Sequence, residues 1–249
     1  MNTSEVNKVA EVTALFWVMK IVATTLGETL GDFIAQTLGL GYTFGMVITV
    51  MFFIVVLLLQ LNVKRYVPSC FWIVIIATTT LGTEISDFMD RTLGLGYTVG
   101  SVILFSCLSI TLVIWYKRFK NLSISPIYQK KKELLFWVAV LFSNSLGTAF
   151  GDYLTDEIGL TYVIGALVTG AIIGIVLLLH YYSKINEVFL FWVAFVFTRP
   201  FGATFGDFLT KPLAKGGLDL GTWQATLVSV ILISGLIIYS HRNINKTKA

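Results

Sequence analysis

The sequence is poor in charged residues and in the residue types that build catalytic and redox sites. Only 13% of its 249 residues are charged, whereas about a quarter are charged in a soluble domain. The two cysteines, Cys70 and Cys107, lie in or beside apolar runs, which favours small apolar side chains over a disulfide or a metal pair. The two histidines, His180 and His241, stand at the ends of apolar runs and argue against a haem or a histidine-rich zinc site. No serine-protease-like triad, phosphate loop or CxxC motif is visible, so we do not expect an enzyme.

What the chain has instead is apolar runs of about 20 residues, the length that crosses a hydrocarbon core of about 30 Å. Its mean hydropathy is +0.81, and 56% of its residues are hydrophobic. These runs predict a polytopic membrane protein that is surrounded by the lipid bilayer. Helices are expected, because each span must satisfy its own backbone hydrogen bonds in lipid. The N-terminal residues lack the basic segment and the cleavage site of a signal peptide, so the first run is predicted to be a retained span.

A motif of seventeen residues occurs four times along the chain. Its first copy runs from Phe16 to Asp32, and in every copy the Asp follows the Trp by fifteen positions. A short connection that contains glycine and a plainly apolar segment follow each copy, so each repeat predicts two helices. The residues that mark the four copies are Trp17, Trp72, Trp137 and Trp192. The apolar second segments are Phe44–Leu61, Val99–Trp115, Val163–Leu179 and Thr222–Tyr239.

The repeats predict an all-α membrane protein with eight transmembrane helices in four parallel two-helix repeats. The intervals between the marker Trp residues are 55, 65 and 55, so the chain divides into two pseudosymmetric halves, residues 1–120 and 135–249. A basic linker, residues 121–134, joins them. Because each repeat holds an even number of spans, all four share one orientation. We expect the motif helices to pack centrally and the plain second helices to face the lipid.

The distribution of Lys and Arg predicts the orientation in the membrane. Thirteen of the eighteen lie in the termini and in the loops between repeats, Lys8, Lys246 and Lys248 among them. The loops within repeats are predicted to hold only Arg91, Lys211 and Lys215. The positive-inside rule therefore places both termini and the basic linker in the cytoplasm, with the protein in the cell membrane. The basic linker is interpreted as a topology-setting loop and not as a nucleic-acid or lipid patch, so no nucleic-acid partner is expected. The sequence leaves open whether the chain forms a homo-oligomer.

The residues shared by the four motifs fall on one stripe of a helix, which should face the protein interior. A pair of small residues, spaced four apart, lies in that stripe and lets helix backbones approach closely. The pairs are Gly27/Gly31, Gly82/Ser86, Gly147/Gly151 and Gly202/Gly206. The marker residues Trp17, Trp72, Trp137 and Trp192 stand near the starts of the spans and are interpreted as interfacial anchors.

The carboxylates within the motif helices are the sharper signal. They are Asp32, Asp87, Asp152 and Asp207, one for each repeat, with Glu28 and Glu84 in the first two copies. Two cations, Lys20 and Arg199, lie in the corresponding spans and are predicted to compensate acidic charge, with a gate or an anion contact as the alternative for Arg199. Four carboxylates would then have no intramembrane partner. A charge at mid-membrane costs at least about 2.5–3.5 kcal/mol, so a proton, a cation, water or an interfacial position must offset it.

Carboxylates together with hydroxyl and amide oxygens suit hard cations such as Mn²⁺, Mg²⁺ or Ca²⁺, and no other cofactor is expected. Proton exchange is an equally physical use of such acids. The structural alternative is that each Asp caps a helix end or accepts from the loop next to it. Pro200 should kink or interrupt the fourth motif helix. The candidate supporting oxygens, which lie one to two turns before the Asp residues, are Thr24, Thr25, Thr79, Thr80, Thr83, Asn144, Ser145 and Thr148.

Nearly the whole chain resembles the bacterial integral membrane proteins that are assembled from four copies of a two-span repeat of unknown function. The resemblance rests on the marker Trp and on the Gly-Asp pair of each copy, which in the second repeat is Ser86-Asp87. It implies the architecture and a location in the cell envelope, and it implies no activity.

The sequence therefore predicts a membrane transporter or channel for a small cation, a divalent metal such as Mn²⁺ or a proton-coupled cation, that uses intramembrane carboxylates. Two alternatives remain. One is a transporter of a small organic solute with proton-coupling carboxylates, which a wide apolar cavity would favour. The other is a membrane scaffold or sensor that transports nothing, in which helix ends and loop amides would satisfy the Asp residues.

Overall fold

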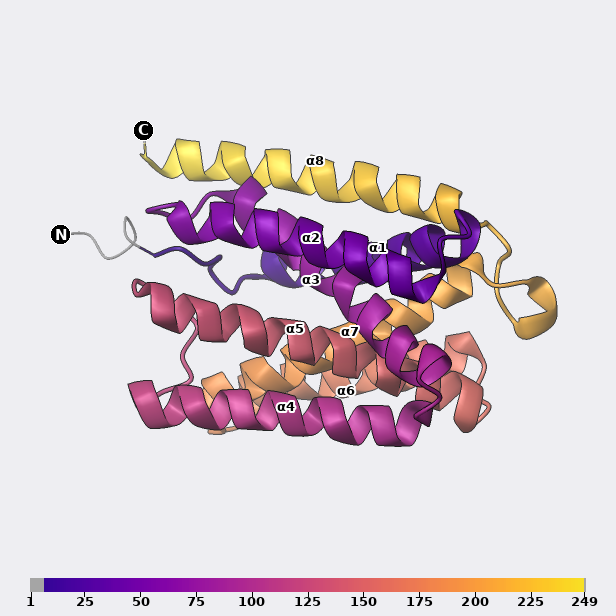
Figure 1. Ribbon diagram of the computed structural model, residues 1–249. Helices are drawn as coiled ribbons and strands as arrows, with labels where there is room; N and C mark the ends of the chain where they lie inside the picture. Colours follow the sequence, from indigo (N-terminus) through magenta and orange to yellow (C-terminus); the bar gives the residue numbers. More distant parts are fainter. Residues whose placement is uncertain (1–6, 249) are drawn as a thin grey trace.

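The computed structural model describes the backbone of residues 7–248 and the side chains of residues 7–244. The first six residues, on which the prediction of an uncleaved N-terminus rests in part, and the side chains of Lys246 and Lys248 lie outside the described part. Eight α-helices and no strand occur within it, so the all-α fold class is confirmed. The helices are α1 (Ala14–Asp32), α2 (Gly41–Asn62), α3 (Pro68–Asp87), α4 (Gly96–Phe119), α5 (Lys130–Asp152), α6 (Tyr162–Tyr182), α7 (Glu187–Thr210) and α8 (Thr222–Lys248) (Figure 1).

Among the described residues, seven helices are long and apolar enough to cross a membrane. The eighth, α1, has 19 residues and carries Lys20, Glu28 and Asp32. It packs against α3, α7 and α8, and these three polar side chains are buried. Nineteen residues span roughly 28 Å at 1.5 Å per residue, close to the thickness of the hydrocarbon core. The multi-pass membrane fold is therefore confirmed, with α1 as its most polar span.

The four motif helices form a closed ring. Each of α1, α3, α5 and α7 packs on the next, and α7 packs on α1. The second helix of each repeat covers the motif helix of the following repeat: α2 lies on α3, α4 on α5, α6 on α7, and α8 on α1. These outer helices expose large apolar side chains such as Phe44, Leu59 and Phe105. The predicted arrangement of central motif helices inside a lipid-facing wall is what the structure has.

The small residues of the motif stand where the ring helices meet. At each ring contact a glycine lies against the next helix; an added Cβ would collide with that helix at three contacts and would lie 3.0 Å from its backbone at Gly82. Gly27 lies against Thr79, Gly82 against Asn144, Gly147 against Arg199 and Pro200, and Gly202 against Thr24. The second small residues are closely packed as well: a Cβ would lie 3.0 Å from Thr83 at Gly31, 3.2 Å from Ala203 at Gly151 and 3.0 Å from Glu28 at Gly206, and Ser86 is fully buried. The glycines thereby bring the polar side chains beside them close to the ring axis.

The helices of the first three repeats continue beyond the motif Asp as a π-helical turn. These turns are η2 (Phe33–Thr37), η3 (Phe88–Thr92) and η4 (Tyr153–Glu157). The fourth repeat differs, because α7 ends at Thr210 and a 3₁₀ turn, η5 (Leu213–Lys215), follows in a longer loop. π-helical turns are frequent at functional sites. Helix α7 continues through Pro200, so the interruption predicted there is wrong.

The interpretation of the motif Trp residues as interfacial anchors is wrong for three of the four. Trp72, Trp137 and Trp192 are buried, and Trp17 is half-buried. They pack with the preceding Phe residues into an aromatic cluster; the ring centroids of Phe71 and Trp137, for example, lie 5.3 Å apart. The physical reason is that the Trp lies on the same helix stripe as the glycines, and this stripe faces the ring interior.

The first described residues and the end of α8 lie at the same end of the bundle, on the left in Figure 1. A buried ion pair joins Lys8 to Glu133 there, and the amide of Gln60 donates to Glu133 at 3.1 Å. Lys8 therefore serves as more than a topology-setting surface charge. The aromatic cluster lies near this end, and the motif Asp residues lie at the opposite end of the ring.

Candidate functional site

The four motif Asp residues gather at the end of the ring that is remote from the termini. Asp32, Asp87 and Asp152 are the last residues of their α-helices, and Asp207 lies one turn before the end of α7. All four are at least 95% buried. None of the first three caps the turn that follows it, and the hydrogen bonds that the structure gives these carboxylates come from side chains. The predicted capping by helix ends and loop amides is therefore not what satisfies them.

Two cations that the sequence analysis placed in loops pair with these acids. The Nζ of Lys211 lies 2.6 Å from Asp32 and 3.2 Å from Asp207. The Nε of Arg91 lies 3.0 Å from Asp87, and its Nη2 lies 3.8 Å from Asp152. The prediction that four carboxylates lack an intramembrane partner is therefore wrong. The available signal was the spacing: each cation follows its own Asp by four positions, and such residues meet on a helix.

The same position of each repeat carries a different group: Gln36, Arg91, Asp156 and Lys211. Gln36 donates to Asp32, whereas Asp156 accepts from the hydroxyl of Tyr97 at 2.8 Å. Lys211 thus links the fourth repeat to the first, and Arg91 links the second to the third. Each bridge joins two neighbouring repeats of the ring, but the acidic neighbours of the two bridges differ.

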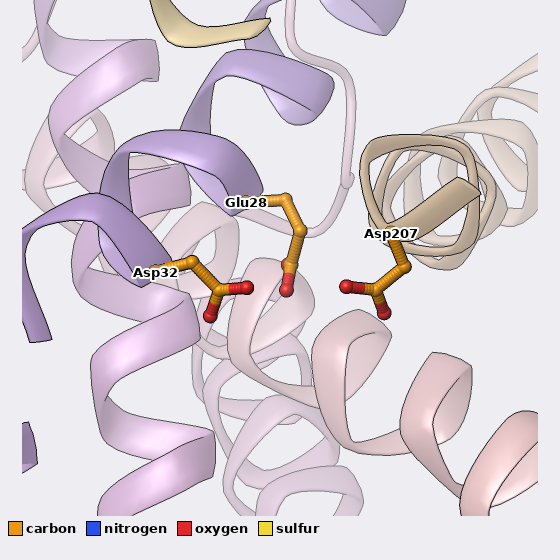
Figure 2. Close-up of side chains that lie close together, drawn as sticks. All are labelled: Glu28, Asp32 and Asp207. Carbon is orange, nitrogen blue, oxygen red and sulfur yellow. The ribbon is translucent and has the colours of Figure 1, made fainter. Parts of the chain in front are cut away.

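Three carboxylates converge on the Lys211 side. Glu28, Asp32 and Asp207 each offer an oxygen, and these three oxygens lie within 4.8 Å of one another. Figure 2 shows the three side chains turned toward a common point, two from α1 and one from α7. We call these residues the carboxylate cluster. Burial lowers the pKa of Lys211, but the charges of Asp207 and Asp32 outweigh it and raise that pKa above the ordinary lysine value. Lys211 is therefore a permanent cation beside the cluster.

Arg199 occupies the axis of the ring, one layer further into the bundle. Its Nη2 donates to Glu28 at 2.9 Å and to the hydroxyl of Thr83 at 2.5 Å. Its aliphatic stem lies against Gly147, so this fully buried side chain from α7 contacts α1, α3 and α5. The charge compensation predicted for Arg199 corresponds to the ion pair with Glu28.

Lys20 forms a second layer near the ring axis, further from the motif Asp residues than Arg199 is. Its Nζ donates to Asn144 at 2.9 Å and lies 4.1 Å from the ring centroid of Phe195. The amide of Asn144 in turn donates to Thr78 at 3.0 Å. No ion pair joins Lys20 to an acid within the described part of the chain. The compensating role predicted for Lys20 is therefore wrong, and an amide oxygen and an aromatic face hold its ammonium instead.

The predicted supporting oxygens are not gathered around the carboxylate cluster. Most of them bond to helix carbonyls or within the Lys20 layer: Thr24 to Thr198 at 3.2 Å, Thr79 to Ala23 at 3.1 Å, Thr80 to Ile76 at 3.0 Å, Ser145 to Leu141 at 3.1 Å and Asn144 to Thr78. The hydroxyl of Thr25 has no hydrogen-bond partner among the described residues. The hydroxyl that does reach the cluster is that of Thr83, 3.5 Å from Glu28. Glu84, the residue after it, points away from the cluster toward Gly45 of α2.

A cavity of about 560 Å³ lies at the opposite end of the bundle, between the segment that leads into α1, the linker and helices α6 and α7. Its walls are mainly apolar and include Trp17, Val176 and Phe191, with His180 and Glu187 among the polar residues. No member of the carboxylate cluster lines it. This apolar cavity is thus separate from the acids that would couple an organic-solute transporter.

The family model described as Repeat of Unknown Function (DUF347) matches the chain four times, over residues 15–66, 70–121, 135–186 and 190–243. Each match covers one two-helix repeat as the structure shows it. No curated protein and no solved structure matches the chain.

Proposed function

We propose that the chain, which belongs to the DUF347 repeat family, is a membrane transporter for a small cation that binds at Glu28, Asp32 and Asp207. The observation that carries the proposal is the convergence of three buried carboxylates from two helices on one point. Carboxylate oxygens at this spacing suit a hard cation, which takes oxygen ligands. We place the protein in the cell membrane with both termini in the cytoplasm, and we propose no enzyme activity.

The charge balance around the cluster supports this proposal. The buried acids at this end of the described bundle are Glu28, Asp32, Glu84, Asp87, Asp90, Asp152 and Asp207. The cations that form ion pairs with them are Arg91, Arg199 and Lys211. Seven acids against three cations leaves four negative charges if every acid is ionised. An unpaired ion costs several kcal/mol in a low-dielectric interior, so protons or an incoming cation must supply the difference.

Lys211 would act as the resident counter-ion of the cluster. Its ammonium contacts two of the three carboxylates and so competes with an incoming cation for their oxygens. Its side chain is 22% exposed and follows the end of α7, which allows the ammonium to withdraw toward water while the acids stay in place. Binding would then exchange one positive charge for another, which avoids the cost of leaving the acids uncompensated.

The layers of Arg199 and Lys20 favour a transporter over an open channel. Both side chains are fully buried on or beside the ring axis, and the aromatic cluster closes the ring beyond them. A small cation that leaves the cluster along this axis would meet two positive charges and then an apolar plug. Passage to the other side therefore requires the ring to rearrange, as in alternating access.

The first prediction concerns binding by the purified full-length protein in detergent. We expect one cation among Mn²⁺, Mg²⁺, Ca²⁺, Na⁺ and K⁺ to raise the unfolding midpoint. At 100 times its dissociation constant it should stabilise the protein by about 2.7 kcal/mol. The double variant Asp32→Asn/Asp207→Asn should lose this gain, because two of the three ligands become neutral amides.

The matched control is Asp87→Asn/Asp152→Asn, which changes the pseudosymmetric acids that flank Arg91. It should keep the cation-dependent gain, whatever its own midpoint. The proposal fails if no cation stabilises the wild-type protein, or if the gain survives in the variant that changes Asp32 and Asp207.

A further inference from the structure

Glu84 is a buried acid that the proposed cation site does not use. Its exposed fraction is 1%, and neither carboxyl oxygen has a hydrogen-bond partner within the described part of the chain. Every motif Asp, by contrast, lies within 4 Å of Arg91 or Lys211. An ionised carboxylate without a hydrogen bond or counter-ion is the most costly group that an apolar interior can hold.

The absence of a side chain at a neighbouring glycine makes space for the carboxyl group of Glu84, but no cation pairs with it among the described residues. Its oxygens face Gly45 of α2, where an added Cβ would lie 2.7 Å from both of them. Helix α2 carries no charged residue. No ion pair joins Glu84 to a cation within the described residues, and acids lie on its own helix, at Asp87, and on α1, at Asp32 and Glu28. Helix α5 presents Asn144 and Ser145 to α3, and the charged residues of α8 begin at His241, which reaches α3 near its first turn.

The backbone ties Glu84 directly to the cation site. The preceding residue, Thr83, receives a hydrogen bond from Arg199, and its hydroxyl lies 3.5 Å from Glu28 of the carboxylate cluster. A change of charge at the carboxylate cluster therefore alters the electrostatic environment of Glu84, which follows Thr83 and lies on the side of α3 that faces α2. Asp32 and Glu28, two members of the cluster, are also among the acids that act on Glu84.

We propose that Glu84 carries the proton that the transporter exchanges against its cation, which makes the protein a cation/proton antiporter. This inference rests on the proposed function of the carboxylate cluster. Without a cation, Glu84 holds a proton and is neutral between α2 and α3. When a cation enters the cluster, its positive charge offsets the neighbouring acids, Glu84 ionises, and one proton leaves. Release of the cation restores the proton.

The test uses full-length protein in liposomes that contain a pH-sensitive dye, with Mn²⁺, Mg²⁺ and Na⁺ as separate probes. External cation added to wild-type liposomes should raise the internal pH as protons leave. In E84Q, which mimics the protonated acid in size and charge, this proton movement should fall to that of protein-free liposomes. Exchange of labelled external cation for unlabelled internal cation should persist, because the cluster is intact. That exchange also shows that the variant is folded.

The matched control is D90N. Asp90 is another buried acid, in the π-helical turn η3 that follows the same helix; it faces Gly100 of α4 and accepts from Ser86 at 3.4 Å. This variant should move protons as the wild type does. Proton movement by E84Q at the wild-type rate would overturn the inference, and so would the loss of both proton movement and cation exchange. Wild-type protein that exchanges none of the probes would instead overturn the proposed cation transport itself.

Discussion

At the scale of single residues, the candidate site depends on which side chain lies one turn beyond each motif Asp. The four repeats offer an amide, a guanidinium, an acid and an ammonium at that position. A nearly symmetric scaffold therefore holds two unlike bridges, one at Arg91 and one at Lys211. The ion pair between Glu28 and Arg199 adds a further difference, because Thr83 and Ala203 occupy the position of Glu28 in other repeats.

The buried pair of Glu28 and Arg199 predicts a coupled effect on stability. Glu28→Gln leaves the fully buried guanidinium without its counter-ion, and breaking such a pair costs about 3–5 kcal/mol. Arg199→Gln should cost a similar amount. The double variant should lose less than the sum of the two, with a coupling of about 0.5–3 kcal/mol for residues in contact. Unfolding of the three purified variants, compared with wild type, measures this; strictly additive losses would show that the pair is not coupled.

At the scale of the helices, close packing through glycine brings the charged layers together. Gly27 lies against Thr79 so tightly that an added Cβ would be only 2.8 Å from the backbone carbon of that residue. Gly174 of the outer helix α6 differs, because nothing lies within 4 Å of the place where its Cβ would stand. Gly27 therefore permits a close contact between two ring helices, whereas Gly174 takes part in no such contact.

This contrast predicts opposite outcomes for the same substitution. Gly27→Ala should destabilise the protein by about 1–3 kcal/mol, the usual cost of overpacking a tight contact. Gly174→Ala, the matched control, should be neutral or should stabilise by up to about 1 kcal/mol, because alanine favours the helix more than glycine does. Unfolding midpoints in detergent check both. Equal midpoints for the two variants would argue against a tight contact between α1 and α3.

At the scale of the whole molecule, the interlocking order of the helices makes the two halves depend on each other. Helix α4 of the first half lies on α5 of the second, and α8 of the second lies on α1 of the first. The ring itself closes through the contacts of α3 with α5 and of α7 with α1. Each half alone therefore leaves one of its motif helices, α1 in the first half or α5 in the second, without its covering helix.

Splitting the chain in the linker between α4 and α5 should therefore give two pieces that need each other. Residues 1–124 and 125–249, produced together with a tag on one piece, should purify as a complex. The tagged first half produced alone should aggregate or be degraded, because α1 lacks α8 and α3 lacks α5. Size-exclusion chromatography distinguishes these outcomes. A monodisperse first half on its own would contradict the interlocked ring.

The sequence by itself determined the eight helices, the four repeats and the stripe that faces inward, because these follow from local apolarity and from the helical period. It also identified Asp32 and its three equivalents as the acids that the four repeats share, since each follows its Trp by fifteen positions. What it could not supply was any contact between distant segments. The pairing of Lys211 with Asp32 joins residues 179 positions apart and exists only because the ring closes α7 onto α1.

The tertiary structure also decided which acids are compensated and which are not. Arg91 and Lys211 were assigned to loops because the helical turns beyond the Asp residues have no hydropathy signal of their own. The sequence analysis placed Glu84 among the candidate ion-binding acids because it lies in the motif. It follows Thr83 by one position, and this step along the helix turns its side chain away from the ring axis and toward α2. The local sequence pattern determines which face of each helix is turned inward. The order of the helices around the ring determines which residues that face contacts.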